Sequence, residues 1–402
     1  MKGQPGTLDV LAVIRAPLEQ YPPSLNQVGL LAEAGLKVGV VDCSRPDFAL
    51  HAFRGPQPVR RLRPCKSTDL KQENLPGMAV RVWRAIRFRR CVLRVLQQYA
   101  PKVVVAYDPN AMAATGSLWK RKRRPKLVWH FHELCLQARK EGGMLNRWAI
   151  DFAYRHAAQA DLITCPDKGR AGILAKAAGL ERLPTVIMNC PRRTARVPPD
   201  ALAGRLASRG KAGFRAVYFH GWIGPSRGLE KVIDSIRWWP EDAVFVAVGP
   251  VTGGYRECLL TASRQAGVEE RVLVLGSVPY AEVLGLAAGA TVGCSLVADQ
   301  KDPNWIYSAG AINKRFEYMA AGLPQVTSDG PGVREIMEKN PCGLCVNPVS
   351  PEAIGAAVRQ LLSDESRRRM YASNGRAAHL QLYNYETQFA EAGNWIGSAC
   401  RA

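Results

Sequence analysis

The sequence has no long hydrophobic run, and it has few acidic residues in its first half. No apolar stretch of the 402-residue chain approaches the roughly 18 residues that a membrane-spanning helix needs. Residues 1–9 also lack the charged-then-apolar order of a secretory signal. The 11 cysteines are scattered along the chain, which does not suggest a compact disulfide framework. We therefore expect a cytoplasmic protein in a reducing compartment.

The shortage of acidic residues is confined to one half of the chain. Residues 1–200 contain 34 Lys and Arg but only 15 Asp and Glu, a net charge of +19, whereas residues 201–402 carry +2. The basic residues are densest in segments 81–90 and 120–126. Such segments are most often solvated faces. The asymmetry nevertheless favours an anionic partner, which could be a membrane surface, a phosphorylated acceptor or a nucleic acid.

The basic segments favour a membrane surface over a nucleic acid. No motif of a nucleic-acid-binding module accompanies them, and only Trp83 and Phe88 interleave them with aromatic rings, so we expect no nucleic acid partner. Segment 82–99 has helical spacing; its expected apolar side is Val82, Ile86, Leu93 and Leu96, and its basic side is Arg84, Arg87, Arg90 and Arg94. This pattern fits peripheral docking on the inner, anionic face of a membrane.

Short apolar runs alternate with helical patterns in both halves, which indicates two doubly wound, Rossmann-like α/β domains. Strands are expected at 10–14, 38–41, 103–106, 127–131, 161–164, 216–219, 243–248, 272–275, 292–296 and 325–327. Helices are expected at 25–34 (capped by Ser24), 82–99, 229–236, 255–265, 281–288, 314–321 and 333–338.

Length and composition divide the chain. At 402 residues it is too long for one hydrophobic core. Prolines and arginines crowd together near residues 187–199, which suggests a linker. We expect a first domain at 1–190, a linker at 191–212 and a second domain at 213–385. A C-terminal helix at 386–402 is expected to pack back toward the first domain.

The most specific motif lies at residues 312–335, INKRFEYMAAGLPQVTSDGPGVRE, with a Gly-rich turn at 219–230, FHGWIGPSRGLE. These stretches resemble the donor site of family-four retaining glycosyltransferases, and a weaker resemblance covers most of the chain. The resemblance implies the GT-B fold, with two Rossmann-like domains facing a cleft. It also implies transfer of a hexose-type sugar from a nucleotide-sugar donor, with retention and without a metal or other cofactor. A UDP-sugar is expected, with GDP- and dTDP-sugars as alternatives.

Physical reasoning gives the donor residues consistent roles. Lys314 and Arg227 lie at or before predicted helix starts, where cations and backbone N–H groups favour a diphosphate. The resemblance implies that Glu317 accepts hydrogen bonds from a ribose diol. The alternative for Lys314 and Glu317 is a surface ion pair at i, i+3. Gly221, Trp222, Val278 and Asn313 complete the expected donor-binding set.

Three positions depart from the family pattern. Ala309 stands where the family commonly has the first of two glutamates, Trp222 follows Gly221 where arginine is usual, and Arg227 replaces a lysine. Asn313 with Lys314 is expected to compensate. The departures keep a catalytically silent scaffold open as an alternative. A nucleotide-sugar epimerase or hydrolase is a further alternative, for which Glu133 is the candidate water-activating carboxylate.

In the first half, His132 and Glu133 directly follow a predicted strand, where α/β domains expose catalytic groups. The resemblance implies that His132 lies against the donor sugar. A zinc site at His130, His132 and Glu133 lacks a second ligand cluster, and a histidine satisfied in the core is the other alternative. Arg15, Tyr21 and Ser24 follow the first strand and are expected to face the acceptor. We expect this to be a lipid-linked glycan, with a soluble small molecule as the alternative.

Overall fold

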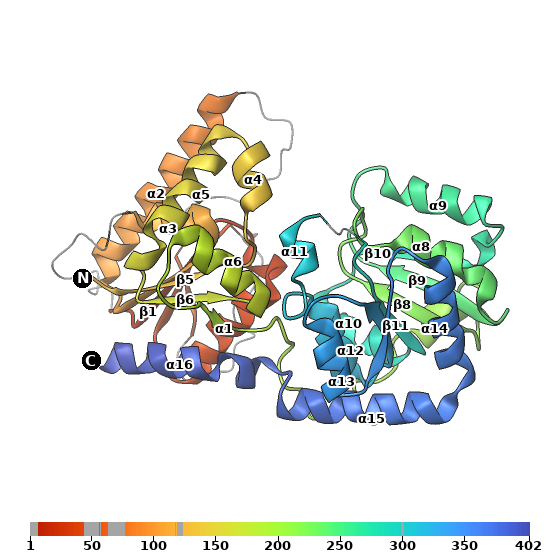
Figure 1. Ribbon diagram of the computed structural model, residues 1–402. Helices are drawn as coiled ribbons and strands as arrows, with labels where there is room; N and C mark the ends of the chain where they lie inside the picture. Colours follow the sequence, from red (N-terminus) through yellow and green to blue (C-terminus); the bar gives the residue numbers. More distant parts are fainter. Residues whose placement is uncertain are drawn as a thin grey trace. The chain divides into compact units, whose positions relative to one another are not determined.

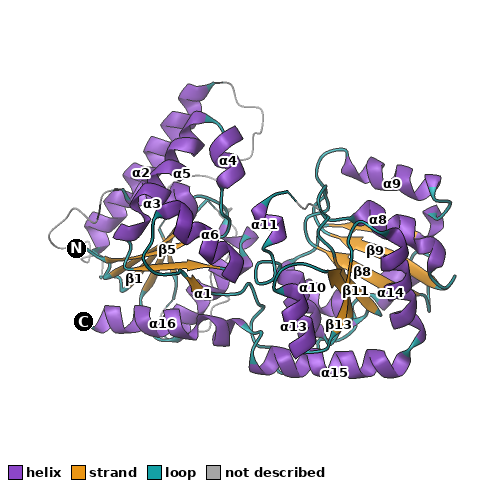
Figure 2. Cartoon of the chain, viewed as in Figure 1, coloured by secondary structure: helices purple, strands orange, loops and turns teal. Residues whose placement is uncertain are grey.

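The computed structural model describes residues 7–43, 56, 58–62, 77–116, 118, 124–298 and 301–402. Of these, the residues up to Met188 and from Gln388 onward form one compact unit, and Asn189–Thr387 form another. Each unit is an α/β domain built on one parallel sheet (Figures 1 and 2). Segment 120–123 of the second basic run lies outside the described residues. No described helix has the length and apolar character needed to cross a membrane.

The first unit contains a seven-stranded sheet in the order β3-β2-β1-β4-β5-β6-β7. Its strands are β1 (Val10–Ile14), β2 (Val38–Val41), β3 (Arg60–Arg61), β4 (Val103–Tyr107), β5 (Lys126–His130), β6 (Leu162–Cys165) and β7 (Thr185–Val186). Its helices are α1 (Pro22–Glu33), α2 (Met78–Tyr99), α3 (Asp108–Thr115), α4 (Leu136–Glu141), α5 (Met144–His156), α6 (Lys168–Ala178) and most of α16 (Tyr385–Arg401). The strand order reverses between β1 and β4, which makes their carboxyl ends the expected ligand site.

Both faces of this sheet are covered, which explains why its strands read as continuous apolar runs. Leu11 and Val13 of β1 join one core with residues of α2, α3, α5 and α6. Helices α1 and α16 lie on the opposite face (Figure 1). The end of α16 is tied to the start of β1, where Cys400 Sγ lies 3.6 Å from the carbonyl oxygen of Asp9.

The second unit contains a six-stranded parallel sheet in the order β10-β9-β8-β11-β12-β13. Its strands are β8 (Arg215–His220), β9 (Ala243–Val248), β10 (Val272–Gly276), β11 (Val292–Ser295), β12 (Gln325–Ser328) and β13 (Gly343–Val346). Its helices are α7 (Ala203–Ala207), α8 (Leu229–Ser235), α9 (Tyr255–Gln265), α10 (Tyr280–Ala288), α11 (Pro303–Ile306), α12 (Asn313–Ala321), α13 (Val333–Lys339), α14 (Pro351–Ser363) and α15 (Glu365–Gln381).

Strand β8 shows how the second sheet divides two cores. Val217 and Phe219 point to a core with α8, α9 and α14. Ala216 and Tyr218 point to the other, with α7, α10 and α12. Here the order reverses between β8 and β11, so the loop after β8 lies at the expected ligand site.

Every expected strand is present to within a residue at each end, but three expectations are corrected. Helix α1 begins at Pro22, a favoured first helical position, so Ser24 lies inside the first turn and is not the cap. The segment 191–212 is not a free linker, because Leu202 and Leu206 are buried in the core beside Tyr218.

The third correction concerns the apolar face of α2. The helix buries Phe88, Val92, Val95 and Leu96, whereas Ile86 is 45% exposed. The buried residues lie in the C-terminal half of α2, which packs on the sheet core, while the N-terminal end extends away from it (Figure 1). Trp83 is therefore exposed on the same half of the helix as Ile86.

A close approach of two backbones fixes the turn after β8. Gly249 has a φ of +143°, and a Cβ there would lie 1.9 Å from the Gly221 carbonyl oxygen. We expect Gly249→Ala to destabilise the protein by about 2 kcal/mol or more, because the turn must shift. Gly253 has open space for a Cβ and is the matched control. Urea unfolding measures both, and equal stability of Gly249→Ala and Gly253→Ala would contradict the packing described.

Candidate functional site

In the second unit, the loop after β8 meets the first turn of α12. The Lys314 ammonium lies 4.7 Å from the centre of the Phe219 ring at the end of β8. Gly221 follows with a φ of +118°, and a Cβ there would lie 3.5 Å from Lys314 Nζ. The left-handed backbone conformation favours glycine at this position, and the lysine ammonium would lie at an ordinary van der Waals distance from a Cβ there.

Lys314 is a buried cation. Burial, and next the nearby Arg227, hold the pKa of Lys314 well below its ordinary value. Within the described parts of the chain, no carboxylate forms an ion pair with Lys314. The surface ion pair with Glu317 considered from the sequence is therefore not formed, since both residues are buried and Glu317 bonds elsewhere. An anion bound here would stabilise the charged form of Lys314.

Arg227 lies in the turn that leads to α8. Its guanidinium stacks 4.3 Å from the centre of the Trp305 ring of α11. The preceding residue, Ser226, adopts a left-handed φ of +70°. The stacking on Trp305 fixes the plane of a guanidinium, the group that matches the oxygens of a phosphate. Together with the uncapped N-terminus of α12, Lys314 and Arg227 create an electropositive region suited to a diphosphate.

Glu317, one turn after Lys314, is 2% exposed and held by two donors. His220 Nε2 lies 2.6 Å from Oε2, and the Tyr280 hydroxyl donates to Oε1 at 2.8 Å. Burial raises the pKa of Glu317, but His220, and then Tyr280 and Lys314, outweigh it and hold that pKa below its ordinary value. Glu317 is therefore an ionised carboxylate with a fixed orientation, and each oxygen keeps a lone pair.

The other expected donor-site residues have varied environments. Trp222 is 56% exposed, and its indole N–H donates to Thr252 Oγ1 at 2.6 Å, which fixes the plane of the ring. Asn313 is half-buried at the first position of α12, and Val278 packs at the edge of the core beside α10.

Ala309 is fixed through its backbone. The buried Arg315 donates to the carbonyl oxygens of Ser308 and Ala309, at 3.1 and 2.7 Å. This loop is thus ordered without the usual glutamate at 309. Sequence reasoning missed His220, Tyr280 and Arg315. His220 and Arg315 lie inside the two motifs, whereas no local signal marks Tyr280.

We expect Lys314→Met to stabilise the ligand-free protein while abolishing nucleotide diphosphate binding. The unfolded chain holds the Lys314 proton more tightly than the folded one, so this residue makes stability rise with pH between its lowered folded pKa and the ordinary value of 10.5. At neutral pH the methionine should add on the order of 1 kcal/mol. Chemical unfolding and calorimetry measure the two effects.

Lys339→Met is the matched control, because Lys339 is exposed in an i, i+4 pair with Glu335 and should change neither quantity appreciably. A loss of stability in Lys314→Met, or undiminished nucleotide affinity, would contradict the assignment of Lys314 as a buried lysine that forms no ion pair among the described residues.

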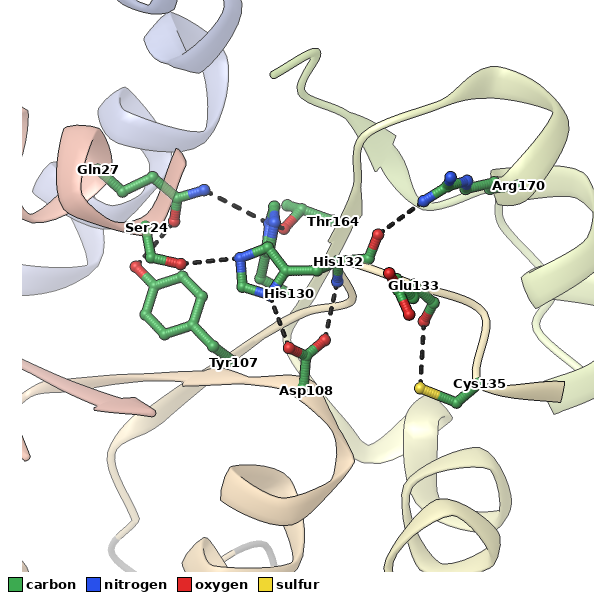
Figure 3. A network of polar contacts seen from close by, with 10 residues as sticks. All are labelled: Ser24, Gln27, Tyr107, Asp108, His130, His132, Glu133, Cys135, Thr164 and Arg170. Atoms are coloured by element: carbon green, nitrogen blue, oxygen red, sulfur yellow. Dashed lines mark hydrogen bonds and ion pairs between the residues drawn. The ribbon is translucent and has the colours of Figure 1, made fainter. Parts of the chain in front are cut away.

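In the first unit, His132 lies at the centre of a hydrogen-bond network (Figure 3). Its Nε2 lies 2.8 Å from Ser24 Oγ of α1, and its Nδ1 lies 2.7 Å from Asp108 Oδ2 at the start of α3. The backbone N–H of His132 donates to Asp108 Oδ1 at 2.9 Å. Because an ionised carboxylate only accepts, Nδ1 carries a proton, and in the neutral ring Nε2 accepts from Ser24. The side chain of His132 is buried, as the alternative of a core histidine requires.

Aromatic rings enclose this imidazole. Tyr21 and Tyr107 lie 5.0 and 5.7 Å from it, centre to centre, and His130 lies at 4.6 Å. Burial, and next His132, hold the pKa of His130 well below its ordinary value, so His130 is neutral. Its Nδ1 lies 2.8 Å from Thr164 Oγ1. In the described part of the chain, no group of three or more His, Cys, Asp or Glu side chains is arranged to hold a metal ion.

The remaining expected residues of the first unit lie around this network. Glu133 is exposed and contributes no side-chain hydrogen bond to the contacts of His132 with Ser24 and Asp108 described above. Arg15, the first residue after β1, donates to Asn110 Oδ1 at 3.1 Å. Burial, and then Asp108, raise the pKa of Tyr21 to about 12, so its hydroxyl stays protonated. Sequence reasoning missed Asp108, although its place directly after β4 is the same signal that singled out His132.

Comparison with known proteins identifies the family of the chain. Residues 208–378 match the family described as "Glycosyl transferases group 1", and residues 25–196 match "Glycosyltransferase Family 4". The chain is a group 1 glycosyltransferase of the family-four type. Its two matched regions correspond to the two units, and the expected GT-B fold, with two Rossmann-like domains, is confirmed.

Curated relatives of this glycosyltransferase are distant. It is 27% identical over 231 residues to a GDP-mannose-dependent alpha-(1-6)-phosphatidylinositol monomannoside mannosyltransferase of Mycobacterium tuberculosis, which covers 56% of this chain and 58% of that protein. It is also 27% identical over 174 residues to the uncharacterized glycosyltransferase MJ1607 of Methanocaldococcus jannaschii, which covers 43% and 42%. The matches therefore span about half the length of these relatives.

Solved structures resemble the glycosyltransferase along nearly its whole length. Anabaena Alr3699/HepE in complex with UDP and glucose superposes with a TM-score of 0.73 at 18% identity, covering 97% of this chain and all of that one. WaaG, a glycosyltransferase involved in lipopolysaccharide biosynthesis, gives 0.68 at 15% identity, covering 96% and 99%. At this level of identity the likeness concerns the fold alone.

Proposed function

We propose that this glycosyltransferase moves a hexose-type sugar from a nucleotide-sugar donor to an acceptor hydroxyl, with retention and without a metal ion. The observation that carries the proposal is the buried Lys314, which lies near Arg227 and has no carboxylate partner among the described residues. These cations and the start of α12 supply positive charge for the diphosphate that leaves as the glycosidic bond breaks. The acceptor proton passes to an oxygen of the leaving diphosphate.

Glu317 fits the ribose of the donor. Its carboxylate is ionised, and two donors from different elements, His220 and Tyr280, fix its orientation. The lone pair left on each oxygen suits two neighbouring hydroxyl groups. The curated relative is named for GDP-mannose and one similar structure contains UDP, so these donors should be tested first.

The donor proposal predicts that one nucleotide family binds and is turned over. We expect UDP or GDP, with the corresponding sugar nucleotide, to stabilise the protein by about 2.7 kcal/mol at 100 times its dissociation constant. Glu317→Gln should weaken binding at least tenfold, because the amide replaces one acceptor oxygen with a donor. Thermal shift and calorimetry measure binding, and NMR of the anomeric proton of the sugar in the transfer product measures retention.

Three outcomes would change this proposal. Failure of every nucleotide to bind would overturn the donor site. Binding without transfer to any sugar or lipid acceptor would favour a silent scaffold. Release of free sugar, or of an epimer, would favour a nucleotide-sugar hydrolase or epimerase.

We also propose that the first unit docks on an anionic membrane, where a lipid-linked glycan would be the acceptor. Exposed apolar side chains and basic residues occur together on α2 and α5. Met78, Trp83 and Ile86 of α2 and Met144 and Trp148 of α5 are 45 to 59% exposed. The two groups are neighbours, because a Cβ on Gly143, just before α5, would lie 3.8 Å from Arg81 Nη1. Apolar anchors beside arginines suit the headgroup region of a bilayer.

Membrane docking predicts co-flotation with vesicles that contain phosphatidylglycerol, at low salt. We expect the double variant Trp83→Ser/Trp148→Ser to reduce the bound fraction at least fivefold, since each indole contributes buried apolar area. Met370→Ser, which changes an exposed methionine on α15 of the second unit, should float like the unchanged protein. If the unchanged protein does not float, the acceptor is better sought among soluble molecules.

A further inference from the structure

Hydrogen bonds join the side chains of Ser24, His132 and Asp108, and their exposure to solvent increases in that order. Ser24 is fully buried, the His132 side chain is 9% exposed, and the Asp108 side chain is 27% exposed. Both ring nitrogens of His132 already have protein partners. Of the three residues that these hydrogen bonds join in Figure 3, Asp108 therefore has the most exposed side chain.

The backbone at Asp108 is strained in a way that supports its carboxylate. Asp108 has a φ of +62°, a left-handed conformation that is unfavourable for a residue other than glycine. From this position, both carboxylate oxygens accept hydrogen bonds from His132, one from its backbone and one from its ring. A carboxylate has about four acceptor sites, so about two remain for a ligand.

The location of Asp108 is that of a ligand-binding group. It directly follows β4, and Arg15 directly follows β1, the neighbouring strand at which the order of the sheet reverses. Open α/β sheets bind ligands in the crevice at this point. Tyr21 packs on the imidazole, and Asn110, two residues after Asp108, accepts from Arg15. A carboxylate beside an aromatic ring and an amide suits the hydroxyl groups of a sugar or polyol.

We propose that Asp108 binds a hydroxyl group of the acceptor, and that His132 and Ser24 are positioning residues for its carboxylate. This inference rests on the proposed function, because it takes the acceptor to be a sugar or polyol. Ser24 donates to Nε2, which leaves the ring proton on Nδ1 and directs it to Asp108. His132, which the family resemblance places against the donor sugar, thus acts on the acceptor by orienting the carboxylate of Asp108.

The test uses the full-length protein labelled with ¹⁵N-histidine. The chain contains six histidines, and His132→Gln assigns the His132 resonances. Methyl α-mannoside and methyl α-glucoside are the probes, since both present neighbouring hydroxyl groups. We expect at least one of them to shift the Nδ1–H resonance of His132 saturably. Asp108→Asn should weaken that response at least tenfold, because one carboxylate oxygen becomes an N–H₂ donor facing the ring.

Two variants make the result specific. Ser24→Ala should weaken the sugar response about threefold, less than either Asp108 variant, since the ring proton of His132 is then no longer confined to Nδ1. Asp108→Ser should lose the response as Asp108→Asn does, with unfolding midpoints of all variants recorded to confirm folding. A response that survives in both Asp108 variants, or that appears at Nε2 and not at Nδ1, would overturn the assignment. So would the absence of a saturable response to either sugar.

Calorimetry with UDP and GDP on the same samples separates this inference from the proposed function. Nucleotide binding without a sugar response would overturn the role of Asp108 alone, because Lys314 and Glu317 belong to the second unit. A sugar response without nucleotide binding would instead leave Asp108 in place and overturn the donor site.

Discussion

The burial of Lys314 against Phe219 is the constraint on which the proposed donor site in the second unit depends. A buried ammonium without a carboxylate partner costs stability, and a chain under selection for stability alone would place an apolar residue there. The surrounding structure nonetheless accommodates this lysine. Gly221 lies beside its ammonium, the face of the Phe219 ring lies against it, and Gly249 lets the two turns approach each other. These contacts hold the cation in place without neutralising it, which is what a site for an anionic ligand requires.

The first unit holds a charged group of the opposite sign, the carboxylate of Asp108. Asp108 accepts hydrogen bonds from two N–H groups of His132 and remains partly exposed. Its left-handed backbone conformation allows both hydrogen bonds to form at once. In each unit the charged group lies at the carboxyl end of the sheet, near the place where the strand order reverses. A parallel sheet gathers several loop starts at that edge. Residues far apart in sequence, such as Ser24 and His132, therefore meet there.

The strands could be predicted from the sequence because parallel strands buried on both faces are continuous apolar runs, as in Val10–Ile14 and Ala243–Val248. The contacts of Glu317 could not be predicted in the same way. His220 is 97 residues away and Tyr280 is 37, and only the packing of α10 and β8 against α12 brings them together. Similarly, the apolar face of α2 depends on where the helix leaves the sheet, which its periodicity alone does not reveal.

The motif residues differ in how far their sequence pattern determines their role. A diphosphate demands cations at helix starts, so Lys314 and Arg227 follow from general electrostatics even where neighbouring positions such as Ala309 depart from the family pattern. A hydroxyl acceptor demands only a well-placed polar atom, which many residue types supply. His132 was singled out by its place after a strand and by the family resemblance, whereas the exposure of its partner, Asp108, emerges only from the folded structure. The proposed donor site could therefore be predicted from the sequence, whereas the proposed acceptor site depends on three-dimensional placement.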